Sequence, residues 1–329
     1  MEKARWGVLS TARFGTETAV PAMQKGQSTE VVAIASRDLK KAQAAASRLG
    51  IPMAYGSYEE LLADPAIDAI YNPLPNHLHV PWSVLALEAG KHVLCEKPIA
   101  RTALEARELL AAAEAYPDLH VMEAFMYRFH PQWERARELI REGTIGELRA
   151  VHTTFSFFNE NPADIRNQAE VGGGGVLDIG CYAISVSRWL FGAEPRRVLA
   201  TLELDPRFRT DRQASAILEF DRGTGTFTVG TQIAPYQRVS VHATRGWIEV
   251  EIPFNPPPDR ACRLFYRTGG KVVEIVVDPA DQYAIQADRF SEAVLGRQPL
   301  PALLSDAMSN MKVIDAVFAS TAGGGWADC

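Results

Sequence analysis

The sequence has few cysteines and no long apolar run. Its cysteines are Cys95, Cys181, Cys262 and Cys329, and none of them lies at a metal-ligand spacing from another. They are also too few for a disulfide scaffold of this length, so we expect reduced thiols, a cytoplasmic protein and no metal site. No apolar segment is long enough to span a membrane, and no apolar signal region follows the N-terminus.

The chain also lacks an excess of basic residues. It has 34 lysines and arginines against 40 aspartates and glutamates, a net charge of −6 at pH 7. No overall positive field therefore favours nucleic acid or an anionic membrane, and we expect neither as a partner. A chain of 329 residues without repeats exceeds the usual size of one hydrophobic core, so we predict two globular domains.

The first 124 residues alternate short apolar runs with helix-forming segments. The runs at 5–10, 30–36 and 67–72 are too short to be helices, and an Ala-rich segment at 39–49 separates two of them. This alternation predicts an α/β domain with a doubly wound parallel sheet over residues 1–124. Ligands of such sheets bind at the carboxyl edge, where the strands end.

The first strand-to-helix turn lies where a dinucleotide-binding fingerprint is expected. The glycine positions of G-x-G-x-x-G fall on Ser10, Ala12 and Gly15, so only the third is glycine. Serine and alanine are small enough for the backbone to approach a pyrophosphate, while a plain strand-to-helix turn is the alternative. The residues expected to contact the cofactor here are Ser10, Thr11, Ala12, Arg13 and Phe14.

The second strand ends in Ser36, Arg37 and Asp38. A hydroxyl and a guanidinium at this position suit the 2′-phosphate of NADP, which arginine binds in a bidentate manner. Asp38 is the competing residue, because a carboxylate here bonds the ribose hydroxyls of NAD. We therefore predict NADP as the cofactor, with NAD as the alternative.

The end of the next strand lies at the same predicted edge. After the run at 67–72, we expect Leu74, Asn76 and His77 to contact the cofactor.

The segment at 92–98 ends in Glu96, Lys97 and Pro98. Pro98 keeps Lys97 out of the helical region, so the lysine amine is presented from an extended or turned backbone. A surface ion pair is the alternative for this segment taken alone.

The second half of the chain, residues 125–329, has a different pattern. Strand-like runs follow one another from 149–158 to 271–277, which predicts an α+β domain with a large, mostly antiparallel open sheet. One face of this sheet is either an oligomer interface or solvated. We expect this domain to bind the substrate, and its last helices, near 282–295 and 305–319, to pack back on the first domain.

Four consecutive glycines, Gly172 to Gly175, precede a helical segment that contains Asp178 and Tyr182. A glycine loop allows the backbone to pass very close to another group. Asp178 and Tyr182 are four residues apart and share one helical face. A purely structural pair is the alternative, but behind a glycine loop in a dinucleotide-binding chain we interpret the two as catalytic.

Together these segments make the sequence similar to the glucose–fructose oxidoreductase/inositol dehydrogenase (Gfo/Idh/MocA) family over essentially the whole chain. The resemblance rests on 6–15, Glu96-Lys97-Pro98, 122–131 and the glycine–Asp178–Tyr182 block. It implies an N-terminal Rossmann domain, a C-terminal domain with a large open sheet, NAD or NADP, and homodimers or homotetramers formed through that sheet. The serine and alanine in the fingerprint depart from the family's glycine pattern.

The resemblance also implies roles for single residues. Lys97 is similar to the family's catalytic lysine, which often precedes a cis proline. Glu96 and Lys97 are also expected to contact the cofactor. Asp178 resembles the carboxylate that orients the substrate. Tyr182 occupies the acid/base position, where many relatives have histidine. This tyrosine, together with the Ser-Arg pair of the second strand, makes the sequence similar to the NADP-using branch of the family, which contains dihydrodiol dehydrogenase, xylose dehydrogenases and ketosugar reductases.

These residues predict hydride transfer between a nicotinamide and a hydroxyl or carbonyl carbon of a sugar or cyclic diol. The pKa of a free tyrosine, about 10, is too high for a base at neutral pH, and a cation such as Lys97 lowers it. Arg166 and Tyr283 are expected to line the substrate pocket. The alternatives are a reductase of nucleotide-linked ketosugars, a non-catalytic NADP-binding sensor and a nicotinamide-dependent glycosidase.

Overall fold

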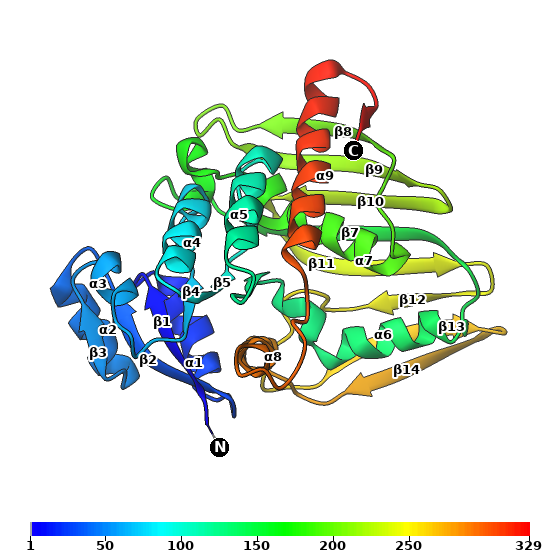
Figure 1. The fold of residues 1–329 in the computed structure, drawn as a ribbon. Helices are drawn as coiled ribbons and strands as arrows, with labels where there is room; N and C mark the ends of the chain where they lie inside the picture. Colours follow the sequence, from blue (N-terminus) through cyan, green and yellow to red (C-terminus); the bar gives the residue numbers. More distant parts are fainter. Residues whose placement is uncertain (1) are drawn as a thin grey trace. The chain divides into compact units, whose positions relative to one another are not determined.

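The computed structural model describes residues 2–329, which form two compact units (Figure 1). The first comprises the described residues up to Met126 together with Asp281–Met308. The second comprises Tyr127–Ala280 together with Ser309–Cys329. The chain therefore returns to the first unit before it ends in the second.

The described part of the first unit is built on a parallel sheet with the strand order β3-β2-β1-β4-β5-β6. The order reverses between β1 and β4, so the sheet is doubly wound, as predicted. Trp6, Ile34, Ile70 and Leu94 form part of its buried core. The strands are β1 (Ala4–Leu9), β2 (Thr29–Ala35), β3 (Met53–Tyr55), β4 (Ala69–Asn72), β5 (His92–Cys95) and β6 (Val121–Glu123).

Helices connect these strands, and side chains cap several of them. The N-cap Thr102 accepts a hydrogen bond from the backbone N–H of Glu105 at 3.2 Å. The late helix α8 packs on this sheet, where the indole N–H of buried Trp6 donates to Ser291 Oγ at 2.9 Å. The helical elements are η1 (Gly15–Ala19), α1 (Val20–Met23), α2 (Leu39–Leu49), α3 (Tyr58–Leu62), η2 (Asn76–Leu78), α4 (His79–Glu88), α5 (Ala103–Ala115) and α8 (Gln282–Val294).

The second unit contains a larger sheet with the order β14-β13-β12-β11-β7-β10-β9-β8-β15. The pair β7–β10 is parallel and the other described pairs are antiparallel, so the predicted mostly antiparallel sheet is confirmed. The strands are β7 (Leu148–Phe158), β8 (Arg197–Leu204), β9 (Asp211–Phe220), β10 (Gly223–Gly230), β11 (Gln232–Ala243), β12 (Gly246–Val250), β13 (Cys262–Thr268), β14 (Lys271–Val277) and β15 (Ala327–Asp328).

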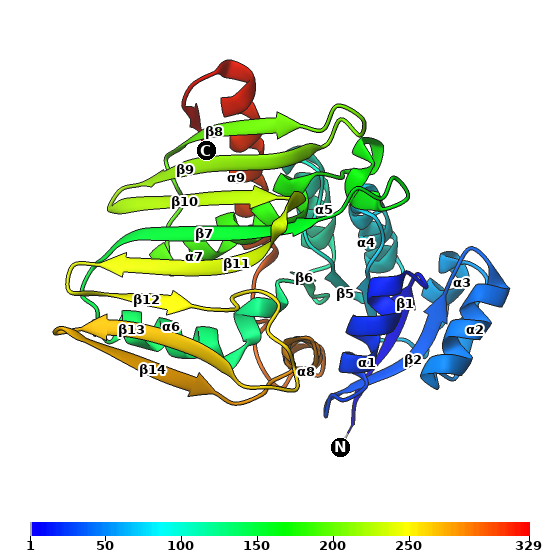
Figure 2. The ribbon, with the colours of Figure 1, turned by 180° about the vertical axis from the view of Figure 1, so that it is seen from behind.

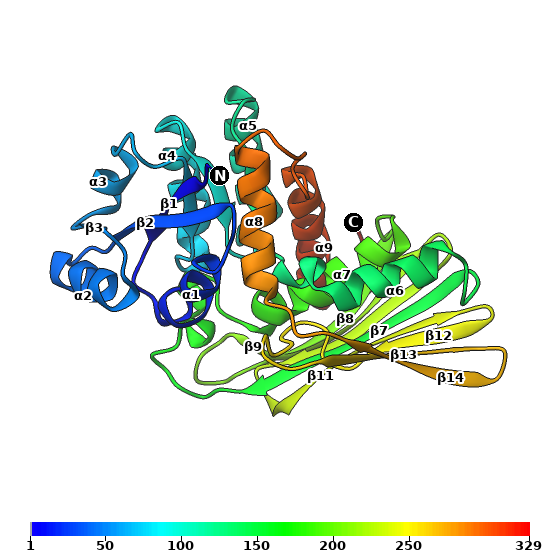
Figure 3. The same cartoon turned by 90° about the horizontal axis from the view of Figure 1, so that it is seen from below.

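Helices cover one face of this sheet and leave the other open. Helices α6 (Pro131–Arg141) and α7 (Cys181–Phe191) lie on one face, and the described residues of this unit place no helix on the opposite face (Figures 2 and 3). In β7, Val151, Thr153 and Phe155 are buried whereas His152 is exposed, the period-two alternation of a sheet with one solvated face. The long helix α9 (Leu304–Gly323) begins in the first unit and ends in the second.

Short helical turns complete the second unit. They are η3 (Met126–Phe129), η4 (Ile165–Asn167), η5 (Ala169–Val171) and the π-helical turn η6 (Val176–Gly180), which runs directly into α7. Within residues 2–329, no helix is both long and apolar enough to cross a membrane. The same residues contain no group of three or more His, Cys, Asp or Glu side chains arranged to hold a metal ion.

Candidate active site

The fingerprint turn after β1 adopts a glycine-like conformation without its first glycine. Ser10 has a φ of 107°, a region that glycine occupies far more readily than serine. Its backbone N–H donates to the Ala35 carbonyl at 3.0 Å, and its Oγ accepts from the Ala12 N–H at 3.0 Å. The hydrogen bond to the Ser10 side chain therefore stabilises a turn in which the Ser10 backbone conformation is itself unfavourable. Arg13 is exposed and forms an ion pair with Glu17 at 2.7 Å.

The end of β2 separates the two cofactor alternatives. Asp38 Oδ1 accepts hydrogen bonds from the backbone N–H groups of Lys40 at 2.9 Å and Lys41 at 3.4 Å, so the carboxylate caps α2. Arg37 is exposed and has no ion-pair partner among the described residues. Ser36 is buried, and its Oγ accepts weakly from the Asp38 N–H at 3.3 Å. The cation at this strand end is thus available to a ligand, whereas the carboxylate is already engaged.

A buried histidine joins the turns that follow β4 and β5. The His79 ring nitrogens lie 2.6 Å from the Leu74 carbonyl oxygen and 2.7 Å from that of Pro98. Burial lowers the pKa of His79 to about 4, although the hydrogen bonds to the two carbonyls oppose this shift. His79 is therefore a structural link between two strand-end turns. The neighbouring His77 is half-buried in η2.

Tyrosines surround the Glu96 side chain at the end of β5. The Tyr71 hydroxyl donates to Glu96 Oε1 at 2.7 Å, and burial together with the Glu96 charge raises the pKa of Tyr71. The Tyr283 ring meets the Phe14 ring with centroids 5.8 Å apart. Burial, and then the Glu96 charge, also raise the pKa of Tyr283. The structure thus places Tyr283 in the first unit with the cofactor-turn residues, and the Lys97–Pro98 peptide bond beside Glu96 is cis.

In the second unit, Tyr182 lies within an aromatic cluster. Its side chain is buried, and its ring centroid lies 5.1 Å from that of Phe254, 5.8 Å from Phe155 and 5.8 Å from Tyr127. Phe254 is fully buried and stacks on Phe155 at 5.0 Å. Packing on several sides fixes the orientation of the Tyr182 ring.

Asp178 forms an ion pair with Arg166. Arg166 Nε donates to Asp178 Oδ2 at 2.8 Å, and Arg166 Nη1 lies 3.4 Å from Asp164 Oδ1. The Asp178 charge is the largest cause that raises the pKa of Arg166. The structure therefore brings together Asp178 and Arg166, two residues that were predicted from the sequence to contact the substrate.

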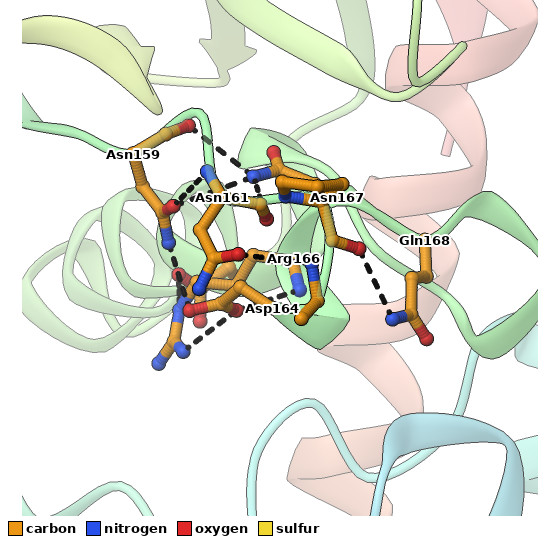
Figure 4. A network of polar contacts seen from close by, with 9 residues as sticks. Asn159, Asn161, Asp164, Arg166, Asn167 and Gln168 are labelled. Carbon is orange, nitrogen blue, oxygen red and sulfur yellow. Dashed lines mark hydrogen bonds and ion pairs between the residues drawn. The ribbon is translucent and has the colours of Figure 1, made fainter.

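Arg166 is held in place by a polar loop between β7 and the glycines (Figure 4). The Asn159 side chain accepts from the Asn161 N–H at 2.9 Å and donates to Asp164 Oδ2 at 2.8 Å. Asp164 Oδ1 in turn accepts from the Arg166 N–H at 3.0 Å, and buried Asn167 donates to the Asn161 carbonyl at 2.9 Å. Side chains that bond neighbouring backbone groups in this way give the loop a defined conformation.

The glycine loop approaches other parts of the same chain. A Cβ on Gly173 would lie 2.6 Å from the Arg166 carbonyl oxygen and 2.7 Å from that of Ile165. Gly174 has a φ of +120°, and a Cβ there would overlap Oδ1 of Asp211. The absence of side chains on these glycines therefore lets their backbone lie against the Arg166 loop and Asp211.

No sequence pattern indicates Asp211, which contacts the start of the helix that bears Asp178 and Tyr182. It opens β9, is 4% exposed, and accepts the Val176 N–H through Oδ2 at 2.5 Å. Burial raises the pKa of Asp211 to about 7 although backbone N–H groups oppose this, and the Asp178 charge raises it further. A single aspartate far along the chain carries no local signal of such a role, because only the packing of β9 on η6 brings it to the helix start.

Two family models match most of the chain. A model described as "Oxidoreductase family, NAD-binding Rossmann fold" matches residues 4–125, and one described as "GFO/IDH/MocA C-terminal domain" matches residues 133–249.

Full-length relatives agree with these matches. The chain is 45% identical over 332 residues to an uncharacterized oxidoreductase of Rhizobium meliloti, covering 99% of each protein. It is 40% identical over 321 residues to D-xylose 1-dehydrogenase (NADP(+)) 2 of Haloferax volcanii, covering 97% of this chain and 98% of the relative.

The fold is also similar to that of a solved oxidoreductase structure. The 3-ketoreductase KijD10 of Actinomadura kijaniata, in complex with NADP and TDP-benzene, superimposes with a TM-score of 0.91 at 32% identity, covering 97% of this chain and 98% of the ketoreductase. Variants of that enzyme with a tyrosine changed to phenylalanine and a lysine changed to alanine have also been solved with NADP.

The raised pKa of Asp211 predicts a pH-dependent contribution to stability. Because its pKa is 3.8 in the unfolded chain and about 7 in the folded one, the folded state retains a proton that the unfolded state releases. The contribution is complete at low pH and is lost as the pH rises through about 7. Replacing Asp211 by Asn removes this titration. The difference in unfolding free energy between wild type and Asp211→Asn should therefore shrink by about 2–3 kcal/mol from about pH 5 to about pH 8.

Urea denaturation at both pH values measures this difference. Asp205→Asn is the matched control, because Asp205 is equally buried and its pKa is lowered, so it does not titrate in this range. A difference between wild type and Asp211→Asn that stays constant with pH would contradict the assignment.

Proposed function

Because the chain belongs to the GFO/IDH/MocA oxidoreductase family and is therefore an NAD(P)-dependent oxidoreductase, we propose that it transfers hydride between NADP and a hydroxyl or carbonyl carbon of a sugar or cyclic diol. The observation that carries this proposal is the Asp178–Arg166 ion pair, one helical turn before Tyr182. It provides an oriented carboxylate for a substrate hydroxyl beside a candidate acid/base. The similarity to the Haloferax enzyme makes D-xylose the first substrate to test.

Tyr182 is the proposed acid/base. In the oxidative direction its phenolate oxygen accepts the proton of the substrate hydroxyl, and in the reductive direction its hydroxyl returns a proton to the alkoxide oxygen. NADP supplies the hydride acceptor or donor when bound. Lys97 stabilises the phenolate with its charge and donates a hydrogen bond to the reacting oxygen. A cation at about 4 Å is worth roughly 4 kcal/mol at an effective dielectric of 20, which is up to about three pKa units.

Asp178 and Arg166 are proposed to orient the substrate. The Asp178 carboxylate accepts a hydrogen bond from a hydroxyl next to the reacting carbon. Arg166 uses Nε and Nη1 for the two aspartates, so its Nη2 donor remains for a substrate oxygen. An acceptor and a donor side by side suit a polyhydroxylated ring.

The residues of the first unit fit NADP. Ser10 has the positive φ that the first fingerprint position favours, Asp38 is engaged in capping α2, and the exposed Arg37 guanidinium is available to a 2′-phosphate. We further propose contacts to the cofactor from Thr11, Ala12, Arg13, Phe14, Ser36, Leu74, Asn76, His77 and Glu96. Tyr283 remains a proposed substrate-lining residue, and its ring contacts Phe14 of the proposed cofactor turn.

A reductase of nucleotide-linked ketosugars is the second candidate. It is favoured by the match to KijD10 with bound TDP-benzene, and by 34% identity over 318 residues to a dTDP-3,4-didehydro-2,6-dideoxy-alpha-D-glucose 3-reductase of the same organism. Turnover of free D-xylose with NADP would favour the first candidate. Turnover only of a TDP-linked ketosugar with NADPH would favour the second.

Replacing Tyr182 by Phe should lower kcat with D-xylose and NADP by about 10²–10⁴-fold, because the proton acceptor is lost while the ring still fills its place. Lys97→Ala should show a similar loss. Steady-state absorbance of NADPH measures kcat, and fluorescence titration measures NADPH affinity, which Tyr182→Phe should leave intact. Tyr116→Phe, a half-exposed tyrosine at the end of α5, is the control and should keep full activity. Unchanged turnover in Tyr182→Phe would refute the acid/base role.

Replacing Arg37 by Ala should raise the KM for NADP by roughly 10- to 100-fold and leave the KM for NAD nearly unchanged. A charge-assisted hydrogen bond to phosphate contributes about 1.5–3 kcal/mol to binding. NAD has no 2′-phosphate, so its binding does not include this hydrogen bond. Arg48→Ala, near the other end of α2, controls for a general change in surface charge. An equal loss for both cofactors would contradict the role of Arg37.

We also propose that the chain forms homodimers or homotetramers through the helix-free face of the second sheet. Light scattering after size-exclusion chromatography should give the mass of two or four chains, and Thr226→Arg, on a strand beside His152 of this face, should lower it. A monomer mass for the wild-type protein would exclude this assembly.

A further inference from the structure

The helix that carries Asp178 and Tyr182 begins without a side chain of its own to cap it. Its N-cap is Gly175, and the next residues, Val176 and Leu177, are apolar and buried. The first N–H groups of a helix need acceptors, and those of a buried helix start cannot obtain them from bulk water. The acceptor must therefore come from elsewhere in the chain.

Asp211 supplies it from the first residue of β9. Its Oδ2 accepts the Val176 N–H at 2.5 Å, and hydrogen bonds from the N–H groups of Gly175 and Asp211 itself also stabilise its charged form. A carboxylate at a helix N-terminus is further favoured by the helix dipole. Asp211 thus acts as an N-cap placed 35 residues after the helix start in sequence.

The same carboxylate also fixes the loop that holds Arg166. Oδ1 of Asp211 occupies the space that a side chain on Gly174 would need. The Gly174 N–H donates to the Arg166 carbonyl at 2.9 Å, and the Gly174 carbonyl accepts from the Asp178 N–H at 3.0 Å. Gly174 therefore connects Asp211, Arg166 and Asp178 through adjacent contacts.

We propose that Asp211 is a positioning residue for the reaction, which sets the first turn of the helix and thereby the placement of Asp178, Arg166 and Tyr182. This role rests on the proposed function of those three residues. Asp211 touches neither substrate nor cofactor in this scheme and acts only through the helix start. A carboxyl group suits this position because its oxygens accept hydrogen bonds from the N–H groups of Val176, Gly175 and Asp211 itself, whereas asparagine would direct one NH₂ group at a donor.

The charges around Asp211 agree with a positioning role. The side-chain charge that acts on it most strongly is Asp178, which is of the same sign. No cation is among the main causes that set its charge state, so backbone N–H groups stabilise the carboxylate. Burying a like charge close to Asp178 is unfavourable for stability, and the geometry at the helix start offsets this cost.

Asp205 provides a matched comparison within the same unit. It is also 4% exposed, and its Oδ1 accepts from the Arg207 N–H at 2.7 Å and the Phe208 N–H at 2.9 Å. Its other oxygen accepts from Gln232 Nε2 at 2.6 Å. Asp205 thus caps a surface turn in the same way that Asp211 caps the helix, but none of these bonds involves the helix of Tyr182.

The test compares Asp211→Asn with Asp205→Asn in the full chain. Hydrogen–deuterium exchange followed by mass spectrometry should show faster exchange over residues 172–182 in Asp211→Asn only. With D-xylose and NADP, kcat should fall roughly 10- to 100-fold in Asp211→Asn, because a small displacement of reacting groups costs this much. NADPH affinity should be unchanged in both variants, and Asp205→Asn should keep the wild-type kcat.

Two outcomes would overturn the proposal. One is unchanged exchange over residues 172–182 in Asp211→Asn. The other is a loss of kcat no larger than that in Asp205→Asn. If Asp211→Asn does not fold, Asp211→Ser, which keeps one acceptor in a smaller side chain, is judged by the same two readouts.

Failure of the proposed function is recognised separately. If the wild-type protein turns over neither D-xylose nor a TDP-linked ketosugar, the proposed reaction fails. The exchange experiment still decides whether Asp211 fixes the helix start, since it needs no substrate. Faster exchange without any loss of turnover in an active enzyme would leave Asp211 as a cap and refute its effect on the reaction.

Discussion

The crowded start of the helix bearing Asp178 and Tyr182 is the constraint on which the candidate substrate site depends. The glycine backbone, the carbonyls of the Arg166 loop and the Asp211 carboxylate all occupy a space that leaves no room for a Cβ at Gly173 or Gly174. These groups are also joined by hydrogen bonds, so a displacement of the Arg166 loop would break contacts at the helix start. The ion pair between Arg166 and Asp178 is therefore formed by a rigid arrangement and needs little side-chain ordering when a substrate binds.

The carboxylates of Asp178 and Asp211 lie near the start of the same helix, and the structure gives them different surroundings. Asp178 has Arg166 as a direct partner and is partly exposed, which suits a group that must accept a hydrogen bond from a substrate. Asp211 is buried, has backbone N–H groups as partners, and its pKa is raised. One carboxylate is thus available to a ligand and the other is used internally. Environments that separate the behaviour of two nearby acids are common at catalytic sites.

In the first unit, the strand ends are fixed by short-range hydrogen bonds. Ser10 adopts a conformation typical of glycine and compensates through its own hydroxyl. Asp38 caps α2, and His79 connects the turn at Leu74 with the one at Pro98. These bonds explain how the turn keeps its form although two fingerprint glycines are missing. They also separate residues that maintain the turns from those, such as Arg37, that are left for a ligand.

The sequence by itself determined the fold class, because alternating apolar runs and helices specify a parallel sheet and consecutive strands specify an antiparallel one. It also indicated the family, because Glu96-Lys97-Pro98 and the glycine–Asp178–Tyr182 block are local patterns. Only the tertiary structure decided that Asp38 is engaged in a cap, that Tyr283 lies in the first unit, and that the glycines accommodate Asp211. The Asp38 cap depends on a side-chain conformation that the sequence leaves open. Tyr283 and Asp211 contact residues that are far from them in the chain. A linear pattern specifies which residues share a face, but the contact between β9 and the helix start depends on how sheet and helix pack together.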